Sequence, residues 1–258
     1  ADVVLLAEDR VRLYVGKLDD PTFTSTYGEG LWYEAPERLG QIGLPAIAPL
    51  IEHLDTDSDD GAARTAYALL LAAQHESVRA RTGGEMPDEA SCEYSFFAPL
   101  TPSQRACLRD AWTGWYDRWK GALSGETRTV KVFLVALEDH GRRGRAIGCG
   151  DSTVAVDRAV AKTPAPLADA LRELLSLPAG AAESAGLYDA LSRSSLTLES
   201  VAVRDGQADI RLVGELSLGG VCDDPRFLWQ ITDTALQFPT VSSVVIRVNG
   251  EVYDGSQR

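Results

Sequence analysis

The first part of the chain places its hydrophobic residues at helical spacing. Apolar side chains recur every three or four residues in "WYEAPERLGQIGLPAIAPLIEHL", "DDGAARTAYALLLAAQ" and "TPSQRACLRDAWTGWYDRWKGAL", which is the period of a helix with one buried face. In the third segment Trp112, Trp115 and Trp119 fall on one stripe, a spacing that indicates core packing. The pattern predicts an all-helical domain over residues 1–121.

The second half of the chain changes to strand-type patterns. "TVKVFLVAL" is a nearly continuous β-rich run, and "STVAVDRAV" is a second strand candidate. In "LTLESVAVRDGQADIRLVGEL", Asp205-Gly206 is the signal of a two-residue hairpin turn. That turn pairs Val203 with Ala208, and the break in alternation after Leu198 indicates a bulge.

Two helical patterns are interspersed with these strands. They are "TPAPLADALRELLSL" and "DDPRFLWQITDTALQF", and "TVSSVVIRVNG" follows as a final strand. The order β-β-α-β-β-α-β over residues 127–258 predicts a compact α/β sandwich. The sequence therefore predicts an α+β chain, with the helical domain first, the sandwich second, and the boundary in "WKGALSGETRT".

Three prolines follow a threonine or an aspartate where a helical pattern begins. Threonine and aspartate side chains accept hydrogen bonds from the first turn of a helix, and proline is favoured at its first position. The sequence therefore predicts helix starts at Thr101-Pro102, Thr163-Pro164 and Asp224-Pro225.

The chain is acidic, with 38 Asp and Glu residues against 25 Lys and Arg residues and a formal net charge of −13. Nucleic acids are bound through clustered basic residues, so this charge disfavours a nucleic-acid partner and an anionic membrane surface. The sequence contains no apolar run of about 18 residues that could span a membrane. We therefore expect membrane association only through a lipid anchor upstream of Ala1.

The order of segments in the second half resembles the GerMN domain family, which is named from bacterial sporulation and germination proteins and occurs in envelope lipoproteins. The resemblance covers residues 127–254, and its most specific parts are "TPAPLADALRELLSLP" and "FPTVSSVVIRVNG". It implies a small α/β fold, an extracytoplasmic location and no known enzymatic activity. The first half is faintly similar to a HEAT-type helical hairpin around "RLGQIGLPAIAPLIEHL", but one hairpin does not make a solenoid.

The four cysteines divide two and two between the predicted domains. No pair has the spacing of a zinc knuckle, and there is no CxxC redox motif. One disulfide in each domain predicts the pairs Cys92–Cys107 and Cys149–Cys222. The alternative is four reduced thiols, which is the usual state in the cytosol. The prediction of two disulfides adds to the expectation of a location outside the cytoplasm.

Cys149 lies between two glycines in "RAIGCGDSTVAV", which raises the hypothesis of a catalytic nucleophile. A nucleophilic thiolate needs a base, and His140 lies nine residues earlier in a charged turn. No third group that would orient the histidine is evident in the sequence. We therefore predict that the protein has no catalytic residues and is not an enzyme.

The acidic run "LDTDSDDGAAR" is the one candidate for a metal site. Asp55, Asp57 and Asp59 match positions 1, 3 and 5 of an EF-hand loop. The match fails where Asp60 replaces the glycine of the sharp turn and Ala66 replaces the closing glutamate. The alternative is a helix-to-helix turn whose acids cap the next helix. The sequence indicates no cofactor.

Three aromatic residues are candidates for an interaction surface. Tyr116 flanks the tryptophan stripe, while Trp32 and Tyr33 lie in "STYGEGLWYEAP", a loop rich in glycine and aromatic residues. The alternative for that loop is a structured connector without a binding role. The sequence gives no oligomeric state.

The combined reading is a non-enzymatic protein of the bacterial cell envelope that acts in protein–protein interaction or assembly. Two alternatives stay open. One is an envelope enzyme or accessory subunit that acts on cell-wall material, and the other is a lipoprotein that binds a small ligand or a cation.

Overall fold

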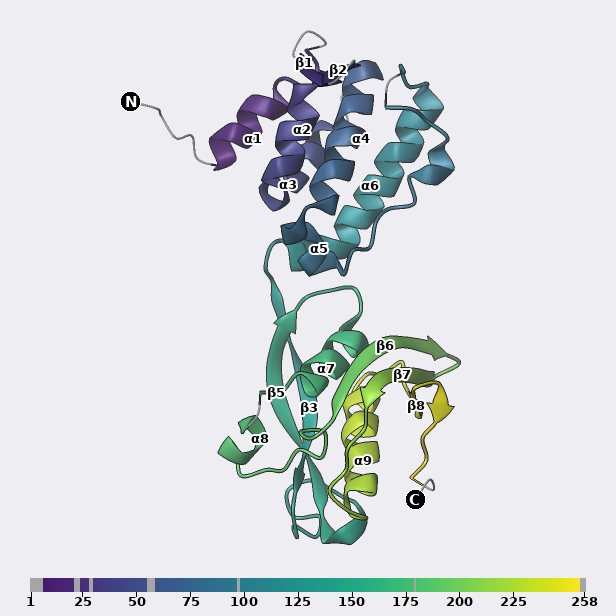
Figure 1. Cartoon of the computed structure of the whole chain (residues 1–258). Coiled ribbons are helices and arrows are strands. Elements are labelled where there is room, and N and C mark those ends of the chain that lie inside the picture. The colour runs from purple at the N-terminus through teal and green to yellow at the C-terminus, as the bar shows by residue number, and fades with distance from the viewer. Residues whose placement is uncertain are drawn as a thin grey trace, which may run out of the picture. The chain divides into compact units, whose positions relative to one another are not determined.

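The computed structural model divides the chain into two compact units, Ala1–Glu126 and Thr127–Arg258, here called unit 1 and unit 2 (Figure 1). The side chains of residues 24–27, 30–32, 59 and 60 are not part of the description. The structure describes residues 7–20, 24–27, 30–54, 59–96, 98–178 and 180–255.

Unit 1 is built mainly of helices that pack around a shared apolar core. α4 contacts both α2 and α3, and α6 contacts α3, α4 and α5. Gly43 separates α2 from α3 with a φ of 70°, a left-handed conformation that glycine adopts without strain. The helices are α1 (Ala7–Val15), α2 (Glu34–Ile42), α3 (Leu44–His53), α4 (Asp59–Gln74), α5 (Glu76–Thr82), the 3₁₀ turn η1 (Ala90–Cys92) and α6 (Pro102–Leu123).

The tryptophan stripe of α6 lies in this core, which confirms the packing prediction. Trp112 and Trp115 are fully buried and meet edge to face, with ring centroids 5.7 Å apart. The indole N–H of Trp112 donates to a carboxylate oxygen of Glu89, and that of Trp115 donates to the carbonyl of Glu85. These bonds satisfy the polar edges of the two rings, as burial of tryptophan requires.

Unit 1 also contains a short hairpin that the sequence pattern does not predict. β1 (Thr24–Tyr27) and β2 (Gly30–Tyr33) pair antiparallel, with Thr24 opposite Tyr33. We expected this stretch to be a connector in an all-helical domain. Strands of four residues are too short for alternation to stand out from a loop.

The start of α6 confirms one of the three predicted helix caps. The Thr101 hydroxyl accepts from the backbone N–H of Gln104, and the Gln104 side chain accepts from the Thr101 N–H. This reciprocal arrangement is a capping box, and it satisfies two N–H groups that have no partner within the helix.

Substitution of Thr101 by alanine is expected to destabilise unit 1 by about 1 kcal/mol, the usual cost of losing a side-chain cap. Chemical denaturation of the full chain, monitored by tryptophan fluorescence, measures this because Trp112 and Trp115 lie on the same helix. Thr101→Ser keeps the hydroxyl and should restore most of the lost stability. Equal destabilisation by both variants would contradict the capping role.

The other two predicted caps are wrong. α7 begins at Pro166, because Thr163 closes a turn before it by accepting from the N–H of Ala165 and donating to Asp169. α9 begins at Asp223, one residue before the predicted cap, and no side chain caps its first turn. At the first place the Thr163 side chain is used by local bonds before and within α7, and at the second the Asp224 carboxylate accepts from the Tyr253 hydroxyl.

Unit 2 contains two sheets. A three-stranded sheet has the order β3-β5-β4, and a four-stranded sheet has the order β6-β7-β8-β9, in which only β7 and β8 run parallel. The strands are β3 (Thr127–Ala136), β4 (Arg145–Ala146), β5 (Ser152–Ala161), β6 (Ser195–Arg204), β7 (Gln207–Glu215), β8 (Ser243–Val248) and β9 (Glu251–Val252). The helical elements are η2 (Gly148–Gly150), α7 (Pro166–Leu175), α8 (Ala181–Ser184) and α9 (Asp223–Leu236).

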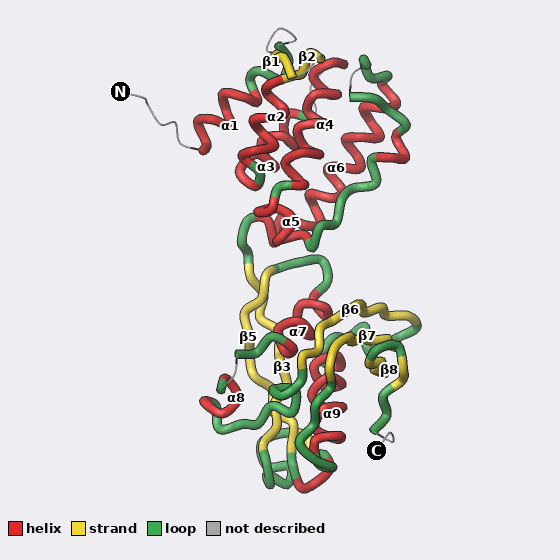
Figure 2. The backbone as a smooth tube through the Cα atoms, viewed as in Figure 1, coloured by secondary structure: helices red, strands yellow, loops and turns green. Residues whose placement is uncertain are grey.

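Helices α7 and α9 lie between the two sheets and contact both of them (Figure 2). Phe227 and Ile231 of α9 share one apolar core with Leu171 of α7, Val132 of β3 and Ile210 of β7. The fold of the whole chain is therefore α+β, as predicted.

The hairpin of β6 and β7 has the predicted register. Val203 lies opposite Ala208, and Asp205 and Gly206 form the turn with φ values of 50° and 80°. The pairing shifts between Leu198 and Ser200, which is the predicted bulge.

Candidate functional site around the Cys149–Cys222 disulfide

The structure forms two disulfides and has no free cysteine. Cys92 is bonded to Cys107, 15 residues later, and Cys149 is bonded to Cys222, 73 residues later. These are the two pairs that the distribution of cysteines predicts. A bonded sulfur has no thiolate to attack a substrate, so the disulfide state leaves no place for Cys149 as a nucleophile.

The glycines that flank Cys149 allow the backbone to turn tightly before β5. Cys149 itself has a left-handed φ of 63°, and Gly150 follows at 75°. A Cβ atom on Gly150 would lie 2.8 Å from the ring of His140, so only glycine fits there. The N–H of His140 donates to the carbonyl of Gly150, at 2.8 Å. The histidine is therefore part of the turn that holds Cys149 in place.

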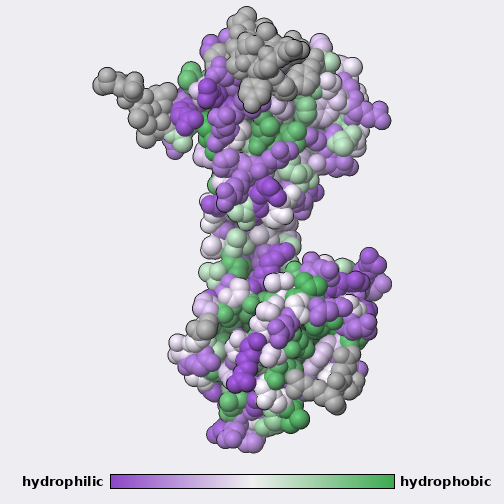
Figure 3. All heavy atoms as spheres, in the orientation of Figure 1, coloured by the Kyte–Doolittle hydropathy of each residue, from purple (hydrophilic) through white to green (hydrophobic). Residues whose placement is uncertain are grey.

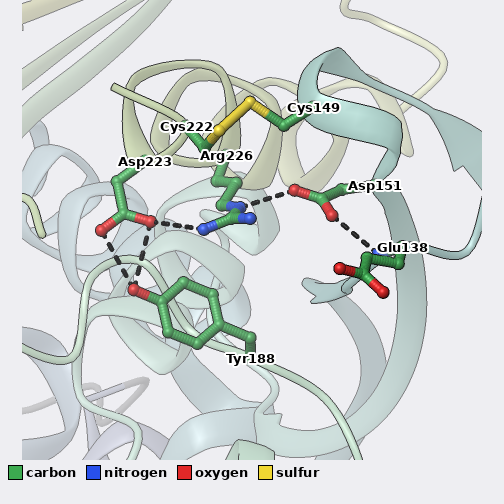
Figure 4. Close-up of a disulfide and its surroundings, with 7 residues drawn as sticks. All are labelled: Glu138, Cys149, Asp151, Tyr188, Cys222, Asp223 and Arg226. Carbon is green, nitrogen blue, oxygen red and sulfur yellow. Dashed lines mark hydrogen bonds and ion pairs between the residues drawn. A yellow bond between two sulfur atoms is a disulfide. The ribbon is translucent and has the colours of Figure 1, made fainter. Parts of the chain in front are cut away.

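An ionic cluster lies beside this disulfide, with Arg226 at its centre (Figure 4). The Arg226 guanidinium donates to Asp151 at 2.7 Å and to Asp223 at 2.9 Å. Asp223 also accepts from the Tyr188 hydroxyl at 3.0 Å, and Asp151 accepts from the backbone N–H of Glu138 at 2.9 Å. We call Asp151, Tyr188, Asp223 and Arg226 the Arg226 cluster.

The Arg226 cluster joins four parts of unit 2 that are distant in sequence. Asp151 precedes β5, and Glu138 follows β3, so one carboxylate holds the two ends of the loop between them. Tyr188 is fixed by a backbone bridge to Val135 of β3. Arg226 and Asp223 lie in the first turn of α9, next to Cys222. The cluster and the disulfide therefore tie the same loop to the same helix end.

Burial explains why these charges are paired. The side chains of Asp151, Asp223 and Arg226 are 1%, 4% and 17% exposed. Burial alone raises the pKa of Asp223, but hydrogen bonds from Arg226, the Gly219 N–H and Tyr188 outweigh it and hold the pKa below its usual value. Burial and the bond to Asp223 raise the pKa of Tyr188, which keeps its hydroxyl as a donor. Each side chain of the Arg226 cluster is thus hydrogen-bonded to another side chain of the cluster.

A second polar group lies on the same helix. Asp233 of α9 accepts from Arg145 of β4 at 2.9 Å and from the Thr153 hydroxyl of β5 at 2.5 Å. The Arg145 guanidinium stacks over the Trp229 ring, 3.9 Å from its centroid. This contact fastens the short strand β4 onto α9.

Asp189 and Glu89, like Asp169 of α7, have a raised pKa, and each is used in hydrogen bonds within the fold. Burial raises the pKa of Asp189, whose side chain accepts from the Leu191 N–H and from Gln230. Burial also raises the pKa of Glu89, which accepts from the Trp112 indole. A perturbed carboxyl can indicate catalysis, but none of these carboxyl groups belongs to the Arg226 cluster.

Of the three aromatic residues predicted for an interaction surface, the structure describes the side chains of Tyr116 and Tyr33. Tyr116 is partly buried against the core of unit 1. The Tyr33 ring lies under the guanidinium of Arg64, 5.0 Å from its carbon. The side chain of Trp32 lies outside the described residues.

The metal candidate cannot be located, because Asp55 and Asp57 and the side chain of Asp59 lie outside the described residues. Within the described part of the chain, no group of three or more His, Cys, Asp or Glu side chains could hold a metal ion. In the same part, no helix is long and apolar enough to cross a membrane.

Unit 1 has a separate cavity between α1 and α3, with a volume of about 490 Å³. Its apolar lining consists of Val11, Val15, Pro45 and Pro49, and its polar lining consists of Glu8, Arg12, Glu52 and His53. No predicted site residue with a described side chain lines it.

Comparisons with known proteins give a family match within unit 2. Residues 144–254 match the family described as Germane, sporulation and spore germination. The tandem GerMN domains of the sporulation protein GerM from Bacillus subtilis are 20% identical, with a TM-score of 0.35, over 48% of this chain and 40% of that chain. The chain thus spans less than half of that structure, and no curated protein matches it. The family match begins after β3, within the span that the sequence resemblance covers, and it shows that unit 2 contains a GerMN-like domain.

Proposed function

We propose that this chain is a non-enzymatic protein of the bacterial cell envelope that acts by binding a protein partner in an assembly. The observation that carries the proposal is the Arg226 cluster beside the Cys149–Cys222 disulfide. Its charged groups bind one another and fix the backbone of a GerMN-like domain. A rigid domain of this kind can present a constant surface to a partner.

The two disulfides support a location outside the cytoplasm. Disulfides persist in oxidising compartments and are rare in reducing ones. The sulfur of Cys149 belongs to an exposed residue, so a cytoplasmic reductant would reach it. The match to a family of sporulation and spore germination also supports a role at the envelope.

The exposed apolar residues of unit 2 support a binding role. Val221, beside Cys222, is 80% exposed, and Leu137, Val203 and Val252 are between 40% and 47% exposed. Figure 3 shows hydrophobic and hydrophilic side chains intermixed on the visible face of this unit. Interfaces between separately folded partners are about as apolar as the rest of a protein surface, so a mixed surface is compatible with such an interface.

Photo-crosslinking in the native host tests this proposal. A photoreactive amino acid at Val221, Leu137, Val203 or Val252 is expected to give an adduct of one defined mass from at least one position. The same reagent at Leu13 of unit 1, which is 47% exposed, is the matched control. Absence of a defined adduct from all four positions of unit 2 would refute the binding role.

Thiol labelling of the same protein tests the location. Protein that is purified from its host and then denatured should take up no alkylating reagent before reduction. After reduction, the reagent should label four cysteines. Labelling of all four thiols before reduction would contradict a location outside the cytoplasm.

A further inference from the structure

The free edge of β3 is covered by side chains of α9. The Gln237 amide accepts from the Lys131 N–H at 2.8 Å and donates to the Lys131 carbonyl at 2.6 Å. The Thr234 hydroxyl accepts from the Phe133 N–H at 3.1 Å, and Gln230 donates to the Phe133 carbonyl at 3.1 Å. These bonds take the place of a neighbouring strand at Lys131 and Phe133 and occupy the backbone groups that these two residues would offer to another chain.

The edges of the four-stranded sheet are interrupted in other ways. β6 carries its bulge at Glu199, the extra residue between Leu198 and Ser200, and a bulge of this kind disturbs pairing. β8 is flanked by β9 and by the Tyr253 N–H, which donates to the Ile246 carbonyl. These features shorten the stretch of each edge that is open to a further strand.

The outer edge of β5 has no comparable cover. β4 pairs only with Ser152 and Thr153, at the beginning of the strand. Beyond that point, over Val154–Val160, the described residues place no hydrogen bond on the β5 backbone other than those of the ladder with β3. β5 lies at the margin of unit 2 in Figure 1. We call residues Val154–Val160 the β5 edge.

The pairing of β3 shows which residues of β5 point their backbone groups outward. Lys131 and Phe133 direct theirs toward α9, away from β5, and they lie opposite Asp157 and Ala155. In an antiparallel ladder, two opposite residues that share no hydrogen bond both direct their backbone N–H and C=O groups away from each other. Asp157, Ala155 and, by alternation, Ala159 therefore present their N–H and C=O groups at the β5 edge.

The β5 edge carries one exposed charge, Asp157, and one charge that is paired within the unit, Arg158. Asp157 lies directly opposite Lys131, and the Arg158 guanidinium donates to Glu173 of α7 at 2.7 Å. An uncompensated inward charge is a common device that blocks edge pairing, and this edge does not carry one. Val154 and Val156 are half-buried on the face toward α7, so an apolar strip also reaches the edge.

We propose that the β5 edge binds an extended segment of a protein partner as an added strand. The segment has apolar residues at alternate positions, which pack beside Val154 and Val156, and a basic residue opposite the exposed carboxylate of Asp157. The net charge of −13 adds a preference for a basic segment. This inference rests on the proposed function and names the surface and the class of partner.

A second copy of this chain is a poor occupant of the β5 edge. Two copies pair antiparallel about a twofold axis, and residues directly opposite share one face of the sheet. The two registers that use most of the edge place Asp157 opposite Asp157 or Arg158 opposite Arg158, which is destabilising. A shifted register avoids these like-charge pairs, but it pairs only a five-residue stretch of each copy. That stretch is either Val154–Arg158 or Asp157–Ala161.

A capped peptide tests the proposal with the full chain. The peptide alternates valine with threonine and has a central lysine in a threonine position, and a matched peptide has glutamate there. Amide NMR is expected to show protection of Ala155, Asp157 and Ala159 by the lysine peptide. The glutamate peptide should bind roughly tenfold more weakly, because a like charge then faces Asp157.

Two variants of the chain sharpen this test. Ala159→Pro removes an outward N–H and no ladder bond, and should weaken peptide binding roughly tenfold, whereas Ala159→Thr keeps the N–H and should bind normally. Asp157→Lys should reverse the preference between the two peptides. That reversal does not depend on whether the proline variant folds.

Three results would overturn the proposal. The first is an absence of protection along the β5 edge, and the second is an unchanged peptide preference in Asp157→Lys. The third is a dimer in sedimentation that Ala159→Pro dissociates, which would make a second copy the occupant. Defined photo-crosslinks in cells together with any of these results would leave the binding function intact and place the partner elsewhere on unit 2.

Discussion

Substitution of Arg226 by methionine is expected to destabilise unit 2 by about 3–5 kcal/mol, the usual cost of removing one partner from a buried ion pair. Methionine keeps much of the side-chain volume but leaves the carboxylates of Asp151 and Asp223 buried without a countercharge. Urea denaturation followed by circular dichroism measures the change. Arg204→Met is the matched control, because Arg204 is exposed and has no ion pair within the described residues, and it should change stability by less than about 0.5 kcal/mol.

The effect of Arg226→Met should depend on pH. In the wild type the pKa of Asp223 is held below its usual value, so its stabilising contribution is present at neutral pH and is lost only as pH falls through that low pKa. In the variant Asp223 loses the bond from Arg226 that lowers its pKa while burial still raises it, so acid relieves its unpaired charge. The stability difference should therefore shrink as the pH is lowered from 7 toward about 4. A difference that is constant over this range would contradict the electrostatic role.

Removal of the Cys149–Cys222 disulfide by a double serine substitution is expected to destabilise unit 2 by about 4 kcal/mol in the chain-entropy model. The bond closes a loop over a sequence separation of 73 residues. The Cys92–Cys107 bond closes a sequence separation of only 15 residues. Its removal by the same double substitution should destabilise unit 1 by about 3 kcal/mol. Thermal unfolding measures both effects when the two variants are compared with the wild type. The wild type is measured with and without reductant.

The disulfide and the Arg226 cluster are expected to act on the same structural element. Both join the turn at Cys149 to the start of α9, so the triple variant should lose less stability than the sum of the separate losses. Full additivity would show that the two features restrain different parts of the unit. Retention of a cooperative unfolding transition after reduction alone is expected, because the ion pairs of Arg226 remain.

The fold of unit 2 could be predicted from sequence because its strong signals are local. The turn at Asp205-Gly206 fixes the register that sets Val203 opposite Ala208, and no tertiary contact competes with it. Thr163 shows the opposite case, since its hydroxyl donates to Asp169 and the helix begins later. A helix start depends on one side chain, and a single competing hydrogen bond, such as that of Thr163 to Asp169, can change the partner of that side chain.

The sequence predicts the disulfide of the candidate site but not the Arg226 cluster beside it. The cysteine pairing followed from the count in each domain, but Arg226 and Tyr188 lie 38 residues apart and carry no motif, so pattern alone could not join them. One signal was present in retrospect. Asp151 and Asp223 lie within two residues of Cys149 and Cys222, so a disulfide between the cysteines must bring two acids together. Two buried acids require a nearby cation.

The cover that α9 gives to β3 has a consequence for biogenesis. Lys131 and Gln237 are separated by 106 residues, so the first strand of unit 2 is made long before the side chains that satisfy it. Contacts of such long range form late in folding. During synthesis or passage across a membrane, the β3 edge therefore stays open until the segment of α9 has emerged. A chain stopped before Asp223 would keep that edge exposed and is expected to aggregate, so the solubility of unit 2 depends on synthesis of the segment 223–237 that covers the edge.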